Sequence, residues 1–167
     1  MKVLVTAASK HGATWEIAEA VRDGLLAADL EVVLTAPEHV TSLEGLDAVV
    51  LGSGVYAGHW LEPARSLVAR LSDQLPHRKV WLFSSGPIGD PPMPDTGPAD
   101  AEKLLASTGA EEHRIFAGRL ERSRLGLAER AVVAALRAPE GDFRDWDAIA
   151  AWAGEIARLL QAEATPA

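Results

Sequence analysis

The sequence predicts an α/β protein in which a parallel sheet lies between two layers of helices. Short apolar runs alternate five times with amphipathic stretches at helical spacing, and this alternation is typical of a parallel sheet with helical crossovers. The first run, KVLVTA, is β-branched and apolar and ends in small residues, as expected for a strand buried on both faces. Right-handed crossovers place helices on both faces of such a sheet. The predicted architecture is therefore a three-layer α/β/α sandwich with a five-stranded parallel sheet.

In the first half of the chain, strands are expected at residues 2–7, 30–35 and 46–53. A helix is expected between the first two, because apolar residues recur there at helical spacing with charged residues between them. Its apolar positions are Ile17, Ala20, Val21, Gly24, Leu25 and Ala28. A second helix follows the third strand, since Pro63 suits the first turn of a helix. Its buried face is expected to carry Ala64, Leu67, Val68 and Leu71.

In the second half, strands are expected at residues 79–85 and 113–118. Pro98 is expected to open the helix between them, and Gly109 to close it. A short extra helix is predicted around residues 128–136, followed by a turn in APEGD. Asp145 is the expected N-cap of the last helix. The inner face of that helix is predicted to carry Ile149, Trp152, Ala153, Ile156 and Leu159.

Composition limits the kinds of partner that the chain is expected to have. At 167 residues the chain is expected to be one domain, covering residues 1–162, with a frayed tail at 163–167. The net charge of −8 argues against nucleic acid as a partner. With no cysteine, redox chemistry needs a bound cofactor, and no metal site is expected. No apolar run is long enough to span a membrane and no signal peptide is evident, so a cytoplasmic location is expected.

The loop after the first strand, SKHGAT, has the composition of a phosphate-binding turn. Small residues let backbone N–H groups converge, the hydroxyls of Ser9 and Thr14 add donors, and the start of a helix supplies a favourable field. An ordinary turn with Thr14 as a helix cap fits the same residues. A Walker loop is excluded because no Gly-Lys-Ser/Thr ending is present, and a dinucleotide fingerprint because Gly-x-Gly-x-x-Gly is missing here. A receiver domain would need aspartates at the ends of the first and third strands, which this chain lacks.

The loops after the third and fourth strands suit a flat ligand. In GSGVYAGHW, glycines permit close approach, and Tyr56 and Trp60 offer aromatic faces for stacking. Packing of Trp60 in the core at a helix start is the other interpretation. The run SSGPIG offers backbone groups to a second edge of the ring, although a proline-rich turn without function also fits its later half. In an open α/β sheet these loops meet where ligands bind.

These residues resemble a known family. The Ser-x-x-Gly-x-Thr pattern in SKHGAT resembles the phosphate loop of flavodoxins, which bind FMN, and the resemblance implies a flavodoxin-like fold with strand order 2-1-3-4-5. GATWEIAEAV, YAGHW and DWDAIAAWAGEIARLL are similar to the flavodoxin-like branch that includes menaquinone-dependent protoporphyrinogen IX dehydrogenase. The resemblance implies phosphate contacts from Ser9, Lys10, His11, Gly12, Ala13 and Thr14. It implies isoalloxazine contacts from Val55, Tyr56, Ala57, Gly58 and His59, and contacts at the other edge of the ring from Ser85, Gly86, Pro87, Ile88 and Gly89.

Two departures from the family pattern bear on function. SGPIGDPP has no second aromatic residue to cover the ring, and the segment before the last helix is shorter and more mixed in charge than in the protoporphyrinogen-oxidising members. Within this resemblance, the Ala57 carbonyl is the expected partner of the reduced ring, and His59 is the candidate proton donor or a plain surface residue. The side chains of Lys10 and His11 are expected to point to solvent.

The sequence leaves the activity open between three functions. The first is a redox protein that passes electrons to a partner protein or to a small-molecule, quinone-type acceptor. The second is protoporphyrinogen IX dehydrogenase activity, and the third is a degenerate interaction module without flavin. FMN is the expected cofactor, a deazaflavin is the alternative ligand, and a homodimer is left open.

Overall fold

The computed structural model describes residues 1–89, 93–94 and 96–164, and its core is a twisted parallel sheet. The parallel strands are β1 (Lys2–Ala8), β2 (Glu31–Leu34), β3 (Ala48–Tyr56), β5 (Lys79–Ser85) and β6 (Glu112–Phe116). They pair in the order β2-β1-β3-β5-β6. Counted in chain order these five strands read 2-1-3-4-5, so the predicted sheet is confirmed. A short strand β4 (His59–Trp60) adds an antiparallel hairpin to the end of β3.

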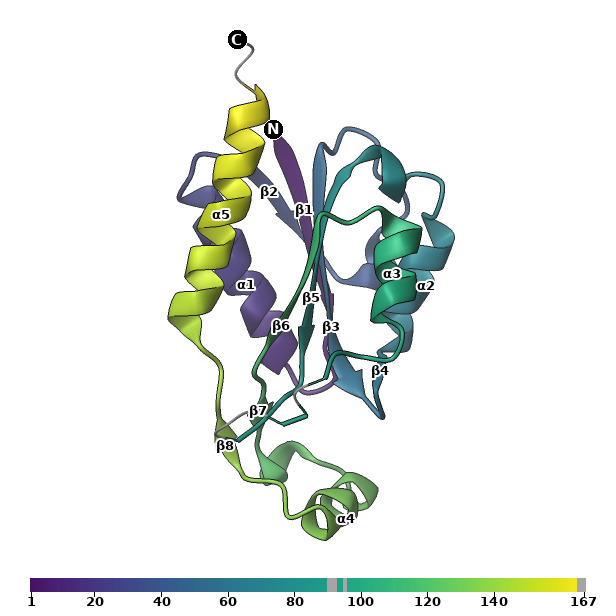
Figure 1. Ribbon diagram of the computed structural model, residues 1–167, viewed down its shortest axis with the longest axis vertical. Helices are drawn as coiled ribbons and strands as arrows, with labels where there is room; N and C mark the ends of the chain where they lie inside the picture. Colours follow the sequence, from purple (N-terminus) through teal and green to yellow (C-terminus); the bar gives the residue numbers. More distant parts are fainter. Residues whose placement is uncertain (90–92, 95, 165–167) are drawn as a thin grey trace.

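Helices cover both faces of the sheet, as predicted (Figure 1). On one face lie α1 (Ala13–Leu26) and α5 (Trp146–Ala164), and on the other lie α2 (Glu62–Arg70) and α3 (Ala101–Thr108). Short 3₁₀ turns occur at Pro37–His39, Leu75–His77 and Arg122–Arg124. No helix among the described residues is long and apolar enough to cross a membrane.

The strands divide their side chains between two apolar cores. In β1, Val3 and Val5 join the core under α1 and α5, whereas Leu4 packs in the core under α2 and α3. Successive side chains of a strand point to opposite faces, so a strand covered on both sides is apolar without alternation. This is why the run KVLVTA predicts a central strand correctly.

The start of the third helix differs from the prediction, whereas the cap of the last helix agrees with it. The third helix starts at Ala101 rather than at Pro98, with Asp100 in the N-cap position, while Gly109 ends it in the left-handed conformation as predicted. The last helix is capped by Asp145, whose Oδ1 accepts the N–H of Ala148 at 2.9 Å.

The inner face of α5 ends on Leu160, not on Leu159, which is 55% exposed. The helix continues through Ala164, so the first two residues of the expected tail are helical, and residues 165–167 lie outside the described part.

The segment between β6 and α5 leaves the sandwich and returns to it. It begins with β7 (Arg119–Leu120) and ends with β8 (Gly141–Asp142), which pair antiparallel. Between them lies α4 (Leu127–Ala135), close to the predicted extra helix, beyond the carboxyl ends of the strands and apart from the two helical layers (Figure 1). We call residues 119–142 the α4 segment.

Candidate functional site

Three loops meet at one edge of the sheet because their strands end side by side. In the strand register Ala8 pairs with Ser53, and Gly54 pairs with Ser85. β1 lies between β2 and β3, so the strand order reverses at β1. Open α/β sheets bind ligands at such a switch point, outside the carboxyl ends of the strands. A cavity of about 360 Å³ lies here, a size typical of small-molecule sites. It extends from the start of α1, past the end of β3, to the α4 segment.

The first wall of the cavity is the loop before α1, which is built to leave helix donors free. Gly12 is the N-cap, with a φ of +90°, and no side chain caps the helix. The Ser9 hydroxyl accepts the N–H of Gly12 at 3.0 Å, so its own proton remains available. Thr14 lies in the first turn rather than at the cap, and with Ser9 it lines the cavity. Gly54 keeps this corner open, since a Cβ there would lie 3.2 Å from the Thr14 Oγ1.

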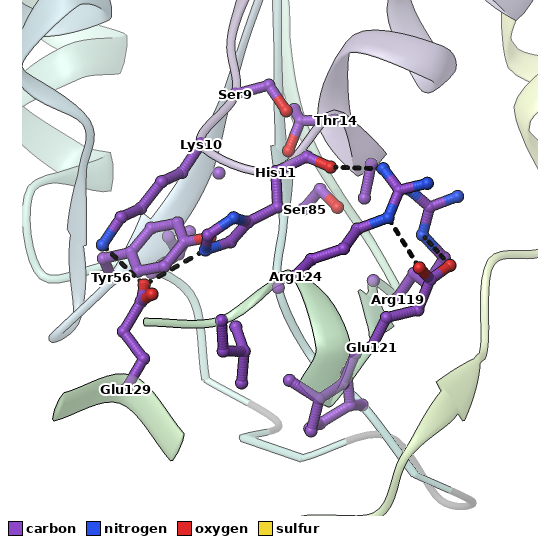
Figure 2. Close-up of a pocket in the computed structure, with 18 of the residues that line it drawn as sticks. Ser9, Lys10, His11, Thr14, Tyr56, Ser85, Arg119, Glu121, Arg124 and Glu129 are labelled. Atoms are coloured by element: carbon purple, nitrogen blue, oxygen red, sulfur yellow. Dashed lines mark hydrogen bonds and ion pairs between the residues drawn. The ribbon is translucent and has the colours of Figure 1, made fainter. Parts of the chain in front are cut away.

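The side chains of Lys10 and His11 face the α4 segment; Lys10 is still about half exposed, as expected, whereas His11 is largely covered, which corrects the expectation that it points to solvent. Lys10 Nζ lies 2.5 Å and His11 Nε2 lies 3.1 Å from the Glu129 Oε1 (Figure 2). Lys10, Gly126 and His11 together lower the pKa of Glu129 to about 2, because all three donate hydrogen bonds to its carboxylate. The loop is thereby joined to α4 by an ion-pair cluster.

The second wall is the end of β3 and its hairpin. Ala57 and Gly58 both have positive φ, +49° and +78°, as in the tight two-residue turn that suits a twisted hairpin. Val55 and Tyr56 line the cavity, whereas Ala57, Gly58 and His59 lie at the hairpin tip, outside its lining. Lys10 Nζ lies 5.2 Å from the centroid of the Tyr56 ring. Burial, and then the charge of Glu129, raise the pKa of Tyr56 to about 12.

Trp60 is a core residue, which corrects the stacking role predicted from the sequence. It is 1% exposed and packs under α2 and α3. Its Nε1 donates to the Ser84 Oγ at 2.7 Å, and that oxygen lies 2.7 Å from the Nε2 of His113. Burial lowers the pKa of His113, against the opposing charges of Asp100 and Glu112. The indole N–H thus has a buried partner, and the ring does not reach the cavity.

The third wall follows β5. Ser85, Gly86 and Ile88 line the cavity, and Pro87 and Gly89 lie outside its lining. The Pro87 carbonyl accepts the N–H of Gly118 at 2.6 Å. A Cβ on Gly86 would lie 3.3 Å from the Cβ of Val55, so the second and third walls approach closely. Residues 90–92 and 95 of this loop lie outside the described part.

Comparison with known proteins agrees with this geometry. A family model described as a flavodoxin domain matches residues 4–147. The chain belongs to the flavodoxin domain family. Flavodoxins bind FMN, which is therefore the cofactor of this family, and the fold supports a flavin-binding role in electron transfer. No curated protein matches this flavodoxin-domain chain.

Three solved structures are similar to it. A flavodoxin from the domain Archaea has a TM-score of 0.67 and 18% identity over 96% of this chain and 99% of its own. The rubredoxin oxygen:oxidoreductase of Desulfovibrio gigas has a TM-score of 0.69 and 14% identity over 99% of this chain and 37% of its own. Oxidised flavodoxin 2 from Bacillus cereus has a TM-score of 0.54 and 26% identity over 82% of this chain and 99% of its own.

The residues of this flavodoxin domain fit FMN. The start of α1 offers uncapped backbone donors and two hydroxyls for a phosphate ester. The same cavity continues to the aromatic ring of Tyr56, which is large enough to contact a flat heterocycle. Among residues 1–89, 93–94 and 96–164, no group of three acidic, histidine or cysteine side chains is placed to hold a metal ion.

The fourth wall of the cavity is supplied by the α4 segment, and the sequence did not predict it. Its apolar members are Leu120, Leu125, Ala128, Val132 and Val133. Its charged members are Arg119, Glu121, Arg124 and Glu129. No motif spacing marks these residues as site residues. The local signals are the Glu121–Arg124 pair, three positions apart, and Glu129 three residues after Gly126, as in a capping box.

Proposed function

We propose that this chain binds FMN in the cavity and transfers electrons through it. Residues 9–14 would hold the phosphate ester, and the isoalloxazine ring would contact Val55 and Tyr56 on one side and Ser85, Gly86 and Ile88 on the other. The observation that carries the proposal is the single cavity that joins the uncapped start of α1 to the Tyr56 ring. An interaction module without flavin has no need for this continuity between an anion site and an aromatic face.

The chain's own groups bind and orient the cofactor. FMN supplies the reversible uptake of electrons, and the protein sets its position and electronic environment. Amides at the start of α1 would donate hydrogen bonds to the phosphate, and Tyr56 would cover part of the ring. The Ala57 carbonyl is the proposed acceptor for a ring N–H in the reduced state. His59 is the proposed proton donor, since it is exposed at the hairpin tip, with its Nδ1 3.9 Å from the Asp100 Oδ2.

We further propose a small, quinone-type molecule as the electron acceptor. The support for this choice is the apolar wall of the α4 segment, where Leu125, Val132 and Val133 line the cavity. Protoporphyrinogen IX is the proposed electron donor in an alternative function, protoporphyrinogen IX dehydrogenase activity, which the family resemblance suggests. The acidic balance of the chain supports a basic protein partner as the alternative acceptor.

The test of the proposal is a titration of the recombinant apoprotein with FMN. Binding at micromolar concentration, with quenched flavin fluorescence and a shifted absorption band, is the expected result. Flavin spectra that do not change at that concentration contradict the proposal. Mixing the reduced holoprotein with menadione or with a basic electron-transfer protein then distinguishes the two acceptors, because the faster reoxidation identifies the class.

A further inference from the structure

Arg124 is a cation positioned at the rim of the phosphate-binding loop. Its Nη1 donates to the His11 carbonyl at 3.2 Å and lies 3.7 Å from the place a Cβ would occupy on Gly12 (Figure 2). Its Nε donates to the Glu121 Oε2 at 2.6 Å. In the described part of the chain its remaining nitrogen, Nη2, has no hydrogen-bond partner. The side chain is 49% exposed and lines the cavity, so this donor is open to a ligand.

A chain of ion pairs holds Arg124 in this place. Arg119 Nε lies 3.1 Å from the Glu121 Oε1, and Arg119 Nη1 lies 3.1 Å from the Glu16 Oε2. Glu16 also accepts from Arg144 Nη1 at 2.6 Å. Burial by itself raises the pKa of Glu16, but Arg144 and Arg119 outweigh it and hold that pKa below its ordinary value. The orientation of Arg124 is therefore fixed from the first turn of α1, the helix that begins at the phosphate loop.

The charge around the cavity differs from the charge of the whole chain. The chain carries a net charge of −8. The cavity lining contains three basic side chains, Lys10, Arg119 and Arg124, against two acidic ones, Glu121 and Glu129. A buried donor of this group, Arg119 Nη2, also has no hydrogen-bond partner among the described residues. The lining thus offers two guanidinium nitrogens, one each of Arg119 and Arg124, without a hydrogen-bond partner among the described residues, and such donors suit an anion.

We infer that Arg124 is a specificity-determining residue that recognises the phosphate ester of the cofactor, so that this chain binds FMN in preference to riboflavin. This inference rests on the proposed function. The α1 amides contact one side of the phosphate, and the Arg124 guanidinium closes the other side from the α4 segment. Glu121 is a positioning residue, because its carboxylate holds the guanidinium groups of both Arg119 and Arg124. A guanidinium matches phosphate oxygens with paired donors.

The test compares FMN with riboflavin in wild type, Arg124→Gln and Arg137→Gln. Arg137 follows the C-cap of α4 and lies outside the cavity lining, so its variant removes the same charge without removing the contact. Dissociation constants come from quenching of flavin fluorescence by the apoprotein. Arg124→Gln is expected to weaken FMN binding about 10- to 100-fold and riboflavin binding less than about twofold. Arg137→Gln is expected to change both by less than about twofold.

The outcomes separate this inference from the proposed function. Equal losses for FMN and riboflavin, or no loss for either, overturn the inference while FMN binding by wild type still stands. Failure of wild type to bind either flavin overturns the proposed function. Salt provides a second measurement on the same two proteins, because screening weakens the attraction between Arg124 and the phosphate in wild type only; raising the ionic strength should therefore reduce the difference in FMN affinity between wild type and Arg124→Gln and leave riboflavin binding constant. If the salt dependence of FMN binding is the same in wild type and in a folded Arg124→Gln, the inference is wrong.

Discussion

Replacing Trp60 by Phe is expected to lower stability and to leave flavin binding unchanged. The indole is 1% exposed and its N–H donates to the Ser84 Oγ at 2.7 Å. The smaller ring loses buried area and leaves a cavity, at a cost of about 1–2 kcal/mol. The missing hydrogen bond adds about 1 kcal/mol. The free energy of unfolding should therefore fall by about 2–3 kcal/mol, which lowers Tm by roughly 5–10 °C for a chain of this size.

Two measurements on two variants check this reasoning. Urea unfolding followed by circular dichroism gives the stability, and fluorescence quenching gives the dissociation constant for FMN. Tyr56→Leu is the matched control, because Tyr56 is 38% exposed and lines the cavity. It should weaken FMN binding about tenfold with little change in stability. If Trp60→Phe weakens FMN binding while the urea midpoint stays constant, the ring stacks on the flavin and its core position is refuted.

Three further variants test the core, the ion pairs and the cluster around Glu129. Gly52→Ala places a Cβ 2.1–2.4 Å from ring atoms of the fully buried Phe83, so urea unfolding should show a loss of about 1–3 kcal/mol; an unchanged midpoint would mean that the ring has room to move. Glu16→Gln removes the negative charge beside Arg144, whose side chain is 2% exposed, and urea unfolding should show a loss of about 1–2 kcal/mol; an unchanged midpoint would mean that the other partners of that arginine are enough to hold it. The lowered pKa of Glu129 means that its stabilising effect is complete above about pH 4.5 and is lost as the pH falls toward 2. Stability should thus fall more steeply below pH 4.5 in wild type than in Glu129→Gln, and parallel pH profiles would contradict the role of the carboxylate.

The sheet was predictable because its signals are local. Apolar runs mark the strands, and Asp145 and Gly109 mark helix ends through their own backbone chemistry. Pro98 predicted a helix start three residues too early, because proline is tolerated in the stretch before a helix as well as in its first turn. Leu159 and Leu160 are adjacent and equally apolar, so only the docking of α5 on the sheet decides which of them is buried.

The site was predictable in part, for the same reason. The loops at 9–14, 55–59 and 85–89 follow strands whose order brings them together. Trp60 was misread because the hairpin turns its ring back under α2, where Ser84 supplies the partner for the indole. Arg124 and Glu129 were missed because they are more than 100 residues away from the phosphate loop in the sequence. Only the path of the α4 segment across the edge of the sheet brings them beside that loop.

The pairing of β7 with β8 closes the base of the α4 segment. Arg119 pairs with Asp142, Leu120 pairs with Gly141, and the Phe143 N–H donates to the Gly118 carbonyl at 3.0 Å. Residues 121–140 thus leave the α/β/α sandwich and return to it at the β7–β8 pair. The sheet and its two layers of helices are formed without them. Length and composition can vary there while the sheet stays as it is, so this fold lets the covering of its ligand pocket diverge separately from the framework that supports the pocket.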